Sequence, residues 1–240
     1  MATIQVPRQI ITVAPEVSSR ELDALKRTAK DLAEEGATVL FLHGWNGSGR
    51  YPQEWVLDLE RNLGDVGIQM VRPDLPNSIY PHAIDQLRVS LGIIKDLKGP
   101  VQIMCHSLGG VVGVLTAHYA PNNLMFDGIT LVASPAADLW NMFPSFFYNH
   151  SLSAASIMGH TKNFTVVQPL KDYRLTRHGW SATDHANRWL DIAGGLGKAI
   201  FLPEWYKHLG HPDKIERCNY VLAALLRNHI VESLIRRNPA

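Results

Sequence analysis

The sequence predicts an α/β fold, a mostly parallel β-sheet with helices on both faces. Apolar strand-like runs alternate with runs of helical periodicity along most of the chain, which is typical of parallel strands joined by helices. The chain has 240 residues, of which 46% are hydrophobic, and this fits one domain (1–240) with a large core. Core strands are expected at about 38–42, 68–72, 101–105, 128–133, 164–168 and 198–202. Helices are expected at about 52–63, 81–97, 108–119 and 182–193, with a last one from about 213 to 226 or beyond.

Two segments depart from this alternation. Residues 1–36 hold a strand-like run at 3–13 and a helix-like run with a capping box at Ser18 and Glu21, and we expect an N-terminal elaboration that packs on the sheet. Residues 135–163 hold the densest group of aromatic side chains in the chain, at the place where a cap would cover a pocket. The same rings would also fit a satellite core. As a cap, they predict that the substrate contacts Trp140, Phe143, Phe146 and Phe147.

The most informative motif is Cys105-His106-Ser107-Leu108-Gly109-Gly110, between an expected strand and an expected helix. A serine on so tight a strand-to-helix turn is held in strained backbone geometry with its hydroxyl clear of the sheet, as in the nucleophile pattern G-x-S-x-G. Gly109 fits this pattern, whereas Cys105 stands where the pattern has glycine. An ordinary glycine-rich turn would look similar, so the interpretation depends on the neighbouring motifs.

A second motif is the apolar run 39–42 followed by His43-Gly44-Trp45 and a loop of small residues. This is similar to the strand and loop that precede the first helix of an α/β-hydrolase. When a serine attacks an acyl carbonyl, the carbonyl oxygen becomes negative and needs backbone N–H donors, which form an oxyanion hole. We expect these donors to be the N–H groups of Trp45 and of Leu108.

A serine nucleophile needs a base, and the base needs a carboxylate to orient it. In this fold the chain order is serine, acid, histidine. Asp172 follows the expected strand 164–168 and is the candidate acid. The alternatives are Asp184 and Asp191 in an amphipathic helical run, and Asp138 before the expected cap.

The candidate base is His211, in the loop between the last expected strand and the last expected helix, with His208 as the alternative. These two histidines would also suit a metal ion, but no further Cys, Asp or His falls at a supporting spacing. The sequence therefore predicts no metal and no organic cofactor.

Taken together, these motifs resemble the α/β-hydrolase superfamily and, within it, the small serine hydrolases related to retinoblastoma-binding protein nine. The resemblance covers roughly residues 37–235. It also rests on Trp55, on the run Val71-Arg72-Pro73-Asp74-Leu75-Pro76-Asn77, on Val167-Gln168 before Asp172, and on Gly210-His211. It implies a catalytic triad of Ser107, Asp172 and His211 with esterase-like activity.

We therefore expect a serine hydrolase that cleaves a small hydrophobic ester or related acyl substrate through an acyl-enzyme. The same residues could serve a lyase, an acyltransferase or a peptidase, because a fold does not fix its reaction. The sequence is also compatible with an inactive binding protein on this scaffold, or with an engineered chain whose site is too loosely held to work.

Composition limits the partners and the location. The net charge is +1 and no basic stripe is interleaved with aromatic residues, so a nucleic-acid partner is not expected. Two cysteines, one of them in the serine motif, favour a reducing compartment over a disulfide framework. We find no signal-peptide pattern and no apolar run of about 18 residues, and expect a cytoplasmic protein without a membrane span. The oligomeric state does not follow from the sequence.

Overall fold

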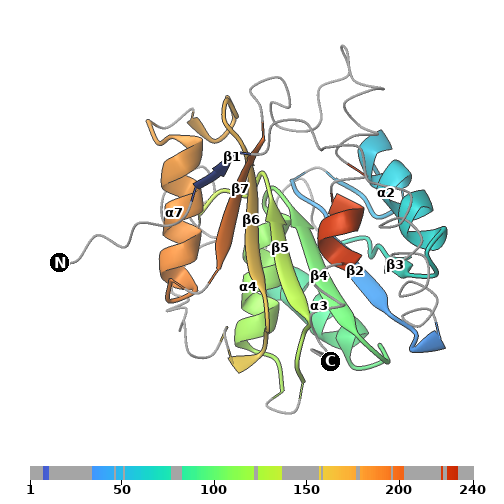
Figure 1. The fold of residues 1–240 in the computed structure, drawn as a ribbon. Helices are drawn as coiled ribbons and strands as arrows, with labels where there is room; N and C mark the ends of the chain where they lie inside the picture. The colour runs from blue at the N-terminus through green and yellow to red at the C-terminus, as the bar shows by residue number, and fades with distance from the viewer. Residues whose placement is uncertain are drawn as a thin grey trace, which may run out of the picture.

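The computed structural model describes residues 8–10, 34–45, 47–50, 52–76, 83–121, 124–136, 157, 159–176, 179–195, 197–202, 223 and 226–231. The described strands form one seven-stranded sheet in the order β1-β7-β6-β5-β4-β2-β3, shown in Figure 1. Neighbouring strands all run parallel. The strands are β1 (Arg8–Ile10), β2 (Thr38–Leu42), β3 (Gln69–Val71), β4 (Val101–His106), β5 (Gly128–Val132), β6 (Phe164–Pro169) and β7 (Lys198–Leu202). The helices are α2 (Glu54–Gly64), α3 (Ala83–Ile94), α4 (Gly109–His118) and α7 (Ala182–Ile192).

The six core strands and the four helices between them confirm the fold class predicted from the sequence. Boundaries differ by a few residues, most at α3, whose helical geometry ends at Ile94. From the expected last helix, residues 223 and 226–231 are described and are helical.

The N-terminal elaboration contributes β1, a short piece of the expected strand 3–13. This strand joins the sheet at its edge, beside β7, with Gln9 paired to Ile200 (Figure 1). Gly36, the last residue of the elaboration, has a φ of 74°. Residues 11–33 of the elaboration and residues 137–156 of the expected cap lie outside the described part of the chain.

Helices cover both faces of the sheet, and alternate strand residues face opposite layers, as the pleat requires. In β2, Leu40 and Leu42 join a core cluster with residues of α3, α4 and α7. Val39 and Phe41 join a second cluster with α2 and with residues of 223–231. Figure 1 shows α3 and α4 on one face, and α2 with the red segment 226–231 on the other. Both faces of the sheet are thus buried, which explains the near-continuous apolar runs of its strands.

The amino-terminal end of the sheet is held by the buried carboxylate of Asp127. Its Oδ2 accepts a hydrogen bond from the Val101 N–H at 3.1 Å, and its Oδ1 lies 2.8 Å from Lys162 Nζ. The amide of Asn163 donates to the Asp127 carbonyl at 2.9 Å. These contacts join the starts of β4, β5 and β6, at the end opposite to the predicted site.

Among the described residues, the predicted site residues Trp45, Ser107 and Asp172 follow the carboxyl ends of β2, β4 and β6. Leu42 pairs with Cys105, and His106 pairs with Val132, so β2, β4 and β5 end at nearly the same level. Open parallel sheets bind their ligands at this edge.

Candidate active site

Ser107 stands on a strained turn between β4 and α4. Its φ is 53°, and among the described non-glycine residues only Ser107 and Ala133 have a positive φ. A left-handed conformation costs an L-residue about 1–2 kcal/mol, so the surroundings must hold it. The Ser107 N–H donates to the Val132 carbonyl at 2.9 Å, and the Ser107 carbonyl accepts from the Gly110 N–H at 3.0 Å. This is the geometry expected of a nucleophile on a strand-to-helix turn.

Two glycines let other segments approach this turn. A Cβ on Gly109 would lie 2.1 Å from the carbonyl oxygen of Leu42, so α4 can start against the end of β2 only with glycine there. A Cβ on Gly44 would lie 2.6 Å from the Cβ of Ser107. The loop after β2 therefore runs directly against the candidate nucleophile.

Cys105 departs from the G-x-S-x-G pattern, and the structure explains how it is accommodated. Its side chain is fully buried, and a Cβ on Gly113 would lie 2.2 Å from its Sγ. The thiol thus fills space that a side chain at position 113 of α4 would need. Burial raises the pKa of the Cys105 thiol, so the thiol stays neutral and packs as a small apolar group.

The two expected oxyanion donors flank the serine along different segments. Leu108 directly follows Ser107 and is the N-cap of α4, where backbone N–H groups lack helical acceptors and the helix dipole favours negative charge. Trp45 directly follows Gly44, and its half-buried ring packs against the core. A turn closes here, with the Gly47 N–H donating to the Gly44 carbonyl at 3.0 Å.

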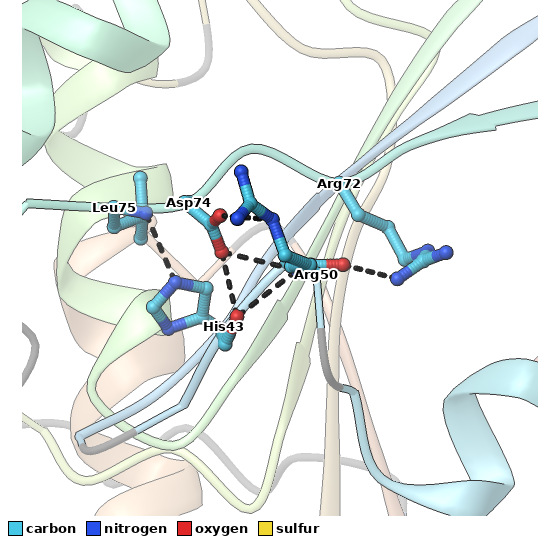
Figure 2. Close-up of polar contacts among 7 residues, drawn as sticks. His43, Arg50, Arg72, Asp74 and Leu75 are labelled. Carbon is cyan, nitrogen blue, oxygen red and sulfur yellow. Dashed lines mark hydrogen bonds and ion pairs between the residues drawn. The ribbon is translucent and has the colours of Figure 1, made fainter.

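The loop after β2 is anchored to the segment after β3 by His43, a buried residue. The Leu75 N–H donates to His43 Nε2 at 3.0 Å (Figure 2). His43 Nδ1 lies 2.9 Å from the Gly44 carbonyl oxygen. Because the Leu75 N–H can only donate, Nε2 is the acceptor and the proton is on Nδ1. Burial lowers the pKa of His43, which agrees with this neutral form.

A second set of contacts anchors the same loop at its far end. Asp74 Oδ1 accepts from the Ser48 hydroxyl at 2.7 Å and from the Arg50 N–H at 3.0 Å (Figure 2). The Ser48 hydrogen bond, and next the Arg50 N–H, lower the pKa of Asp74. Arg72 donates to the Gly49 carbonyl and forms a bidentate ion pair with Glu60 of α2. Its Nε lies 3.1 Å from Glu60 Oε1, and its Nη2 lies 3.0 Å from Glu60 Oε2. The sequence pointed to the run 71–77 without revealing this role.

Asp172 lies just after β6 and is fully buried. Its Oδ1 accepts from the Arg174 N–H at 3.1 Å and from the Leu175 N–H at 3.3 Å, and its carbonyl accepts from the Thr176 N–H at 3.0 Å. These bonds fold the loop into a turn around the carboxylate. In the sheet order, only β5 separates β6 from β4, the strand that ends just before Ser107.

The alternative acids in α7 have a different environment. Asp184 is exposed and closes a capping box, in which Ser181 Oγ accepts from the Asp184 N–H at 3.1 Å and Asp184 Oδ2 accepts from the Ser181 N–H at 2.7 Å. Asp191 is also exposed. A catalytic acid that orients a histidine is normally buried, so Asp172 is the better candidate among these three.

The remaining predicted residues lie outside the described part of the chain. They are the candidate base His211 with its alternative His208, the alternative acid Asp138, and the expected pocket residues Trp140, Phe143, Phe146 and Phe147. Their roles stay predictions.

His106, the last residue of β4, directly precedes the serine, and its sequence position gives no indication of its role. Its ring meets Trp55 of α2 edge to face, with centroids 5.5 Å apart. Trp55 Nε1 donates to Gln53 Oε1 at 2.6 Å, and the Trp55 ring also contacts Phe41. The motif residue before the serine therefore supports the turn from the α2 face.

The described residues contain no group of three or more His, Cys, Asp or Glu side chains placed to hold a metal ion. In the same part of the chain, no helix combines the length and the apolar character needed to cross a membrane.

Comparisons with known proteins show which family the sequence matches. The model of the alpha/beta hydrolase family matches residues 39–224. A search of curated protein sequences found no match.

Solved structures share the fold at low sequence identity. The ydeN gene product of B. subtilis has a TM-score of 0.65 and 17% identity, over 82% of this chain and 98% of that one. Est1E from Butyrivibrio proteoclasticus has a TM-score of 0.61 and 12% identity, over 84% and 90%. The esterase domain of a Rhodothermus marinus protein has a TM-score of 0.57 and 13% identity, over 82% and 87%. The narrower likeness to proteins related to retinoblastoma-binding protein nine stays a prediction.

Proposed function

We propose that this chain, which belongs to the alpha/beta hydrolase family, cleaves a carboxylic ester or a related acyl substrate through an acyl-enzyme formed on Ser107. The observation that carries the proposal is the left-handed φ of 53° at Ser107, on a turn at the carboxyl end of the sheet. A non-glycine residue keeps such a conformation only where its surroundings enforce it, and such positions cluster at functional sites. The buried carboxylate of Asp172 at the same edge supports the proposal.

The first half of the reaction forms the acyl-enzyme. Ser107 Oγ attacks the acyl carbonyl carbon while a histidine base, His211, takes the hydroxyl proton. Asp172 orients the imidazole and stabilises its charged form. The carbonyl oxygen becomes an oxyanion, which the N–H groups of Leu108 and Trp45 bind. Collapse of the intermediate expels the leaving alcohol, which receives the proton from the histidine.

Water completes the cycle at the same site. The neutral histidine removes a proton from a water molecule, which attacks the acyl carbon and forms a second oxyanion. Collapse releases the carboxylic acid and returns the proton to Ser107 Oγ. Every proton in this cycle moves between Ser107, the histidine, the leaving alcohol and water. The proposed reaction therefore needs no cofactor.

The anchored loop after β2 supports this mechanism. An oxyanion hole works when its donors are held in place before the reaction begins. His43 and Asp74 fix the two ends of the loop that carries Trp45. Among the structural neighbours, the Rhodothermus marinus domain is described as an esterase domain, which agrees with acyl chemistry.

A panel of p-nitrophenyl esters of increasing acyl length tests the proposal. The wild-type protein should hydrolyse the shorter esters, and Ser107→Ala should lose the activity. Asp172→Asn should lower kcat by about 10³–10⁴-fold, because the base loses its orienting carboxylate. Activity should fall as the pH drops below about 6.5, the ordinary pKa of a histidine.

Asp184→Asn is the matched control, because it makes the same chemical change at the exposed capping acid of α7. This variant should keep its activity. Hydrolysis that survives in Ser107→Ala would contradict the assignment of the nucleophile. An equal loss in the two aspartate variants would contradict the assignment of the acid.

A further inference from the structure

His185 is a buried histidine of α7 that the proposed mechanism does not use. Its side chain has no exposed surface. The Ala136 N–H donates to His185 Nδ1 at 3.0 Å, and His185 Nε2 lies 3.2 Å from the Leu175 carbonyl oxygen. Because the Ala136 N–H can only donate and the Leu175 carbonyl can only accept, the ring is neutral and carries its proton on Nε2. The ring thus joins two backbone segments that are distant in sequence.

One of these segments carries the candidate acid. Leu175 closes the turn that begins at Asp172, and its N–H donates to Asp172 Oδ1 at 3.3 Å. The same residue therefore holds the carboxylate with its N–H and His185 with its carbonyl. The Leu175 side chain is also fully buried. This end of the turn is therefore held by two backbone hydrogen bonds and by packing in the core.

The other segment leaves β5 beside the candidate nucleophile. Val132, the last residue of β5, accepts the Ser107 N–H at 2.9 Å. Ala133 follows with a φ of 47°. Trp189, one helical turn after His185, donates to the Ser134 carbonyl at 3.1 Å. Residues at i and i+4 share one face of a helix, so this face of α7 holds the exit of β5 at two points.

We propose that His185 is a positioning residue that sets the spacing between Ser107 and Asp172. It is a direct link between the exit of β5, which touches the serine turn, and the turn that carries the acid. The inference rests on the proposed function, since it assigns His185 to the alignment of that triad. A displacement of about 1 Å in a catalytic group can cost about 100-fold in rate, so this link should be visible in kinetics.

Two conservative variants separate the two hydrogen bonds. Glutamine places an amide donor near the position of Nε2, so His185→Gln should keep the bond to Leu175. Asparagine places an oxygen near the position of Nδ1, so His185→Asn should keep the bond to Ala136 and lose the one to Leu175. Leu190→Ala is the control, because Leu190 is buried in the same helix and has no part in the site. It reports what a loss of stability alone does to the activity.

The rate of labelling by a fluorophosphonate probe measures the reactivity of the serine directly. We expect His185→Asn to label about 10- to 100-fold more slowly than Leu190→Ala. His185→Gln should label within a few-fold of the wild type, because Trp189 still holds the exit of β5 when the bond to Ala136 is lost. In His185→Asn the acidic limb of the pH–rate profile should also move to lower pH, because a carboxylate near an imidazole stabilises its charged form. A purely structural role would leave that limb in place.

Equal labelling rates in the two His185 variants and in Leu190→Ala, with an unmoved pH profile, would overturn this inference and leave the proposed function intact. Absence of labelling in the wild type, or undiminished labelling in Ser107→Ala, would instead overturn the proposed function and this inference with it. Folding of each variant is checked by circular dichroism before labelling.

Discussion

Replacing Gly113 by alanine tests how the serine turn tolerates a cysteine in place of glycine. The added Cβ would lie 2.2 Å from Cys105 Sγ and 3.3 Å from Ile103 Cγ2, in a part of the core where both side chains have no exposed surface. Overpacking of a core costs about 1–3 kcal/mol, and so close a contact belongs at the upper end. Alanine gains about 1 kcal/mol over glycine inside a helix. We therefore expect Gly113→Ala to lower the free energy of unfolding by about 2 kcal/mol.

Cys105→Ala, alone and combined with Gly113→Ala, completes a double-mutant cycle. The single change removes one buried heavy atom and should cost about 1 kcal/mol. If the two changes were independent, the double variant would be less stable by about 3 kcal/mol. The new methyl at 113 would instead occupy the space that Sγ leaves, so both packing penalties should largely disappear. We expect the double variant to be about as stable as the wild type.

Urea unfolding, followed by circular dichroism, measures all four proteins. Gly92→Ala is the control for helix propensity, since Gly92 is an exposed residue of α3 and a Cβ there would meet no atom within 4 Å. This variant should be slightly more stable than the wild type. If the double variant lost as much unfolding free energy as the two single variants together, the idea that Cys105 fills the space left by Gly113 would be refuted.

Three further predictions follow from single sites. Ser107→Ala and Ser107→Gly should both be inactive, but the glycine variant should unfold at the higher temperature and be about 1 kcal/mol more stable, because it relieves the left-handed φ; equal stabilities would argue against strain. Asp127→Ala should cost about 2–3 kcal/mol in urea unfolding because it leaves the buried Val101 N–H without its acceptor, and Asp127→Asn should cost less; equal losses would contradict this. Burial lowers the pKa of His43 below its ordinary 6.5, so below pH 6.5 the unfolded chain binds a proton that the folded protein does not. Stability should therefore fall as the pH drops through 6.5, by at most about 1.4 kcal/mol per pH unit for this one proton, and the difference in unfolding free energy between wild type and His43→Gln should shrink. A difference that stays constant from pH 7.5 to 5 would disprove the link.

The strands and the serine turn followed from local sequence patterns. The apolar runs of β2 and β4 predicted parallel strands buried on both faces, and the motif around Ser107 predicted the strained turn that the structure shows. Ser181 and Asp184 form a capping box in the structure, and their spacing in the sequence fits this pattern. That pattern offered a signal for setting Asp184 aside as a catalytic acid.

Contacts between distant segments could not be read in this way. The sequence marks Cys105 as a departure from the glycine pattern, but not that Gly113 makes room for it. It gives His185 no special mark, because its partners at 136 and 175 meet the ring only in the folded chain. The pairing of β1 with β7 joins segments that are far apart in the sequence, such as Arg8 and Ala199, and likewise has no local signature.

The role of Ser107 as the nucleophile can be decided by mass spectrometry of the protein after reaction with a fluorophosphonate probe. We expect one covalent adduct, on the peptide that contains Ser107, and its absence in Ser107→Ala. An adduct on a different residue, or labelling that persists in Ser107→Ala, would contradict the proposed chemistry.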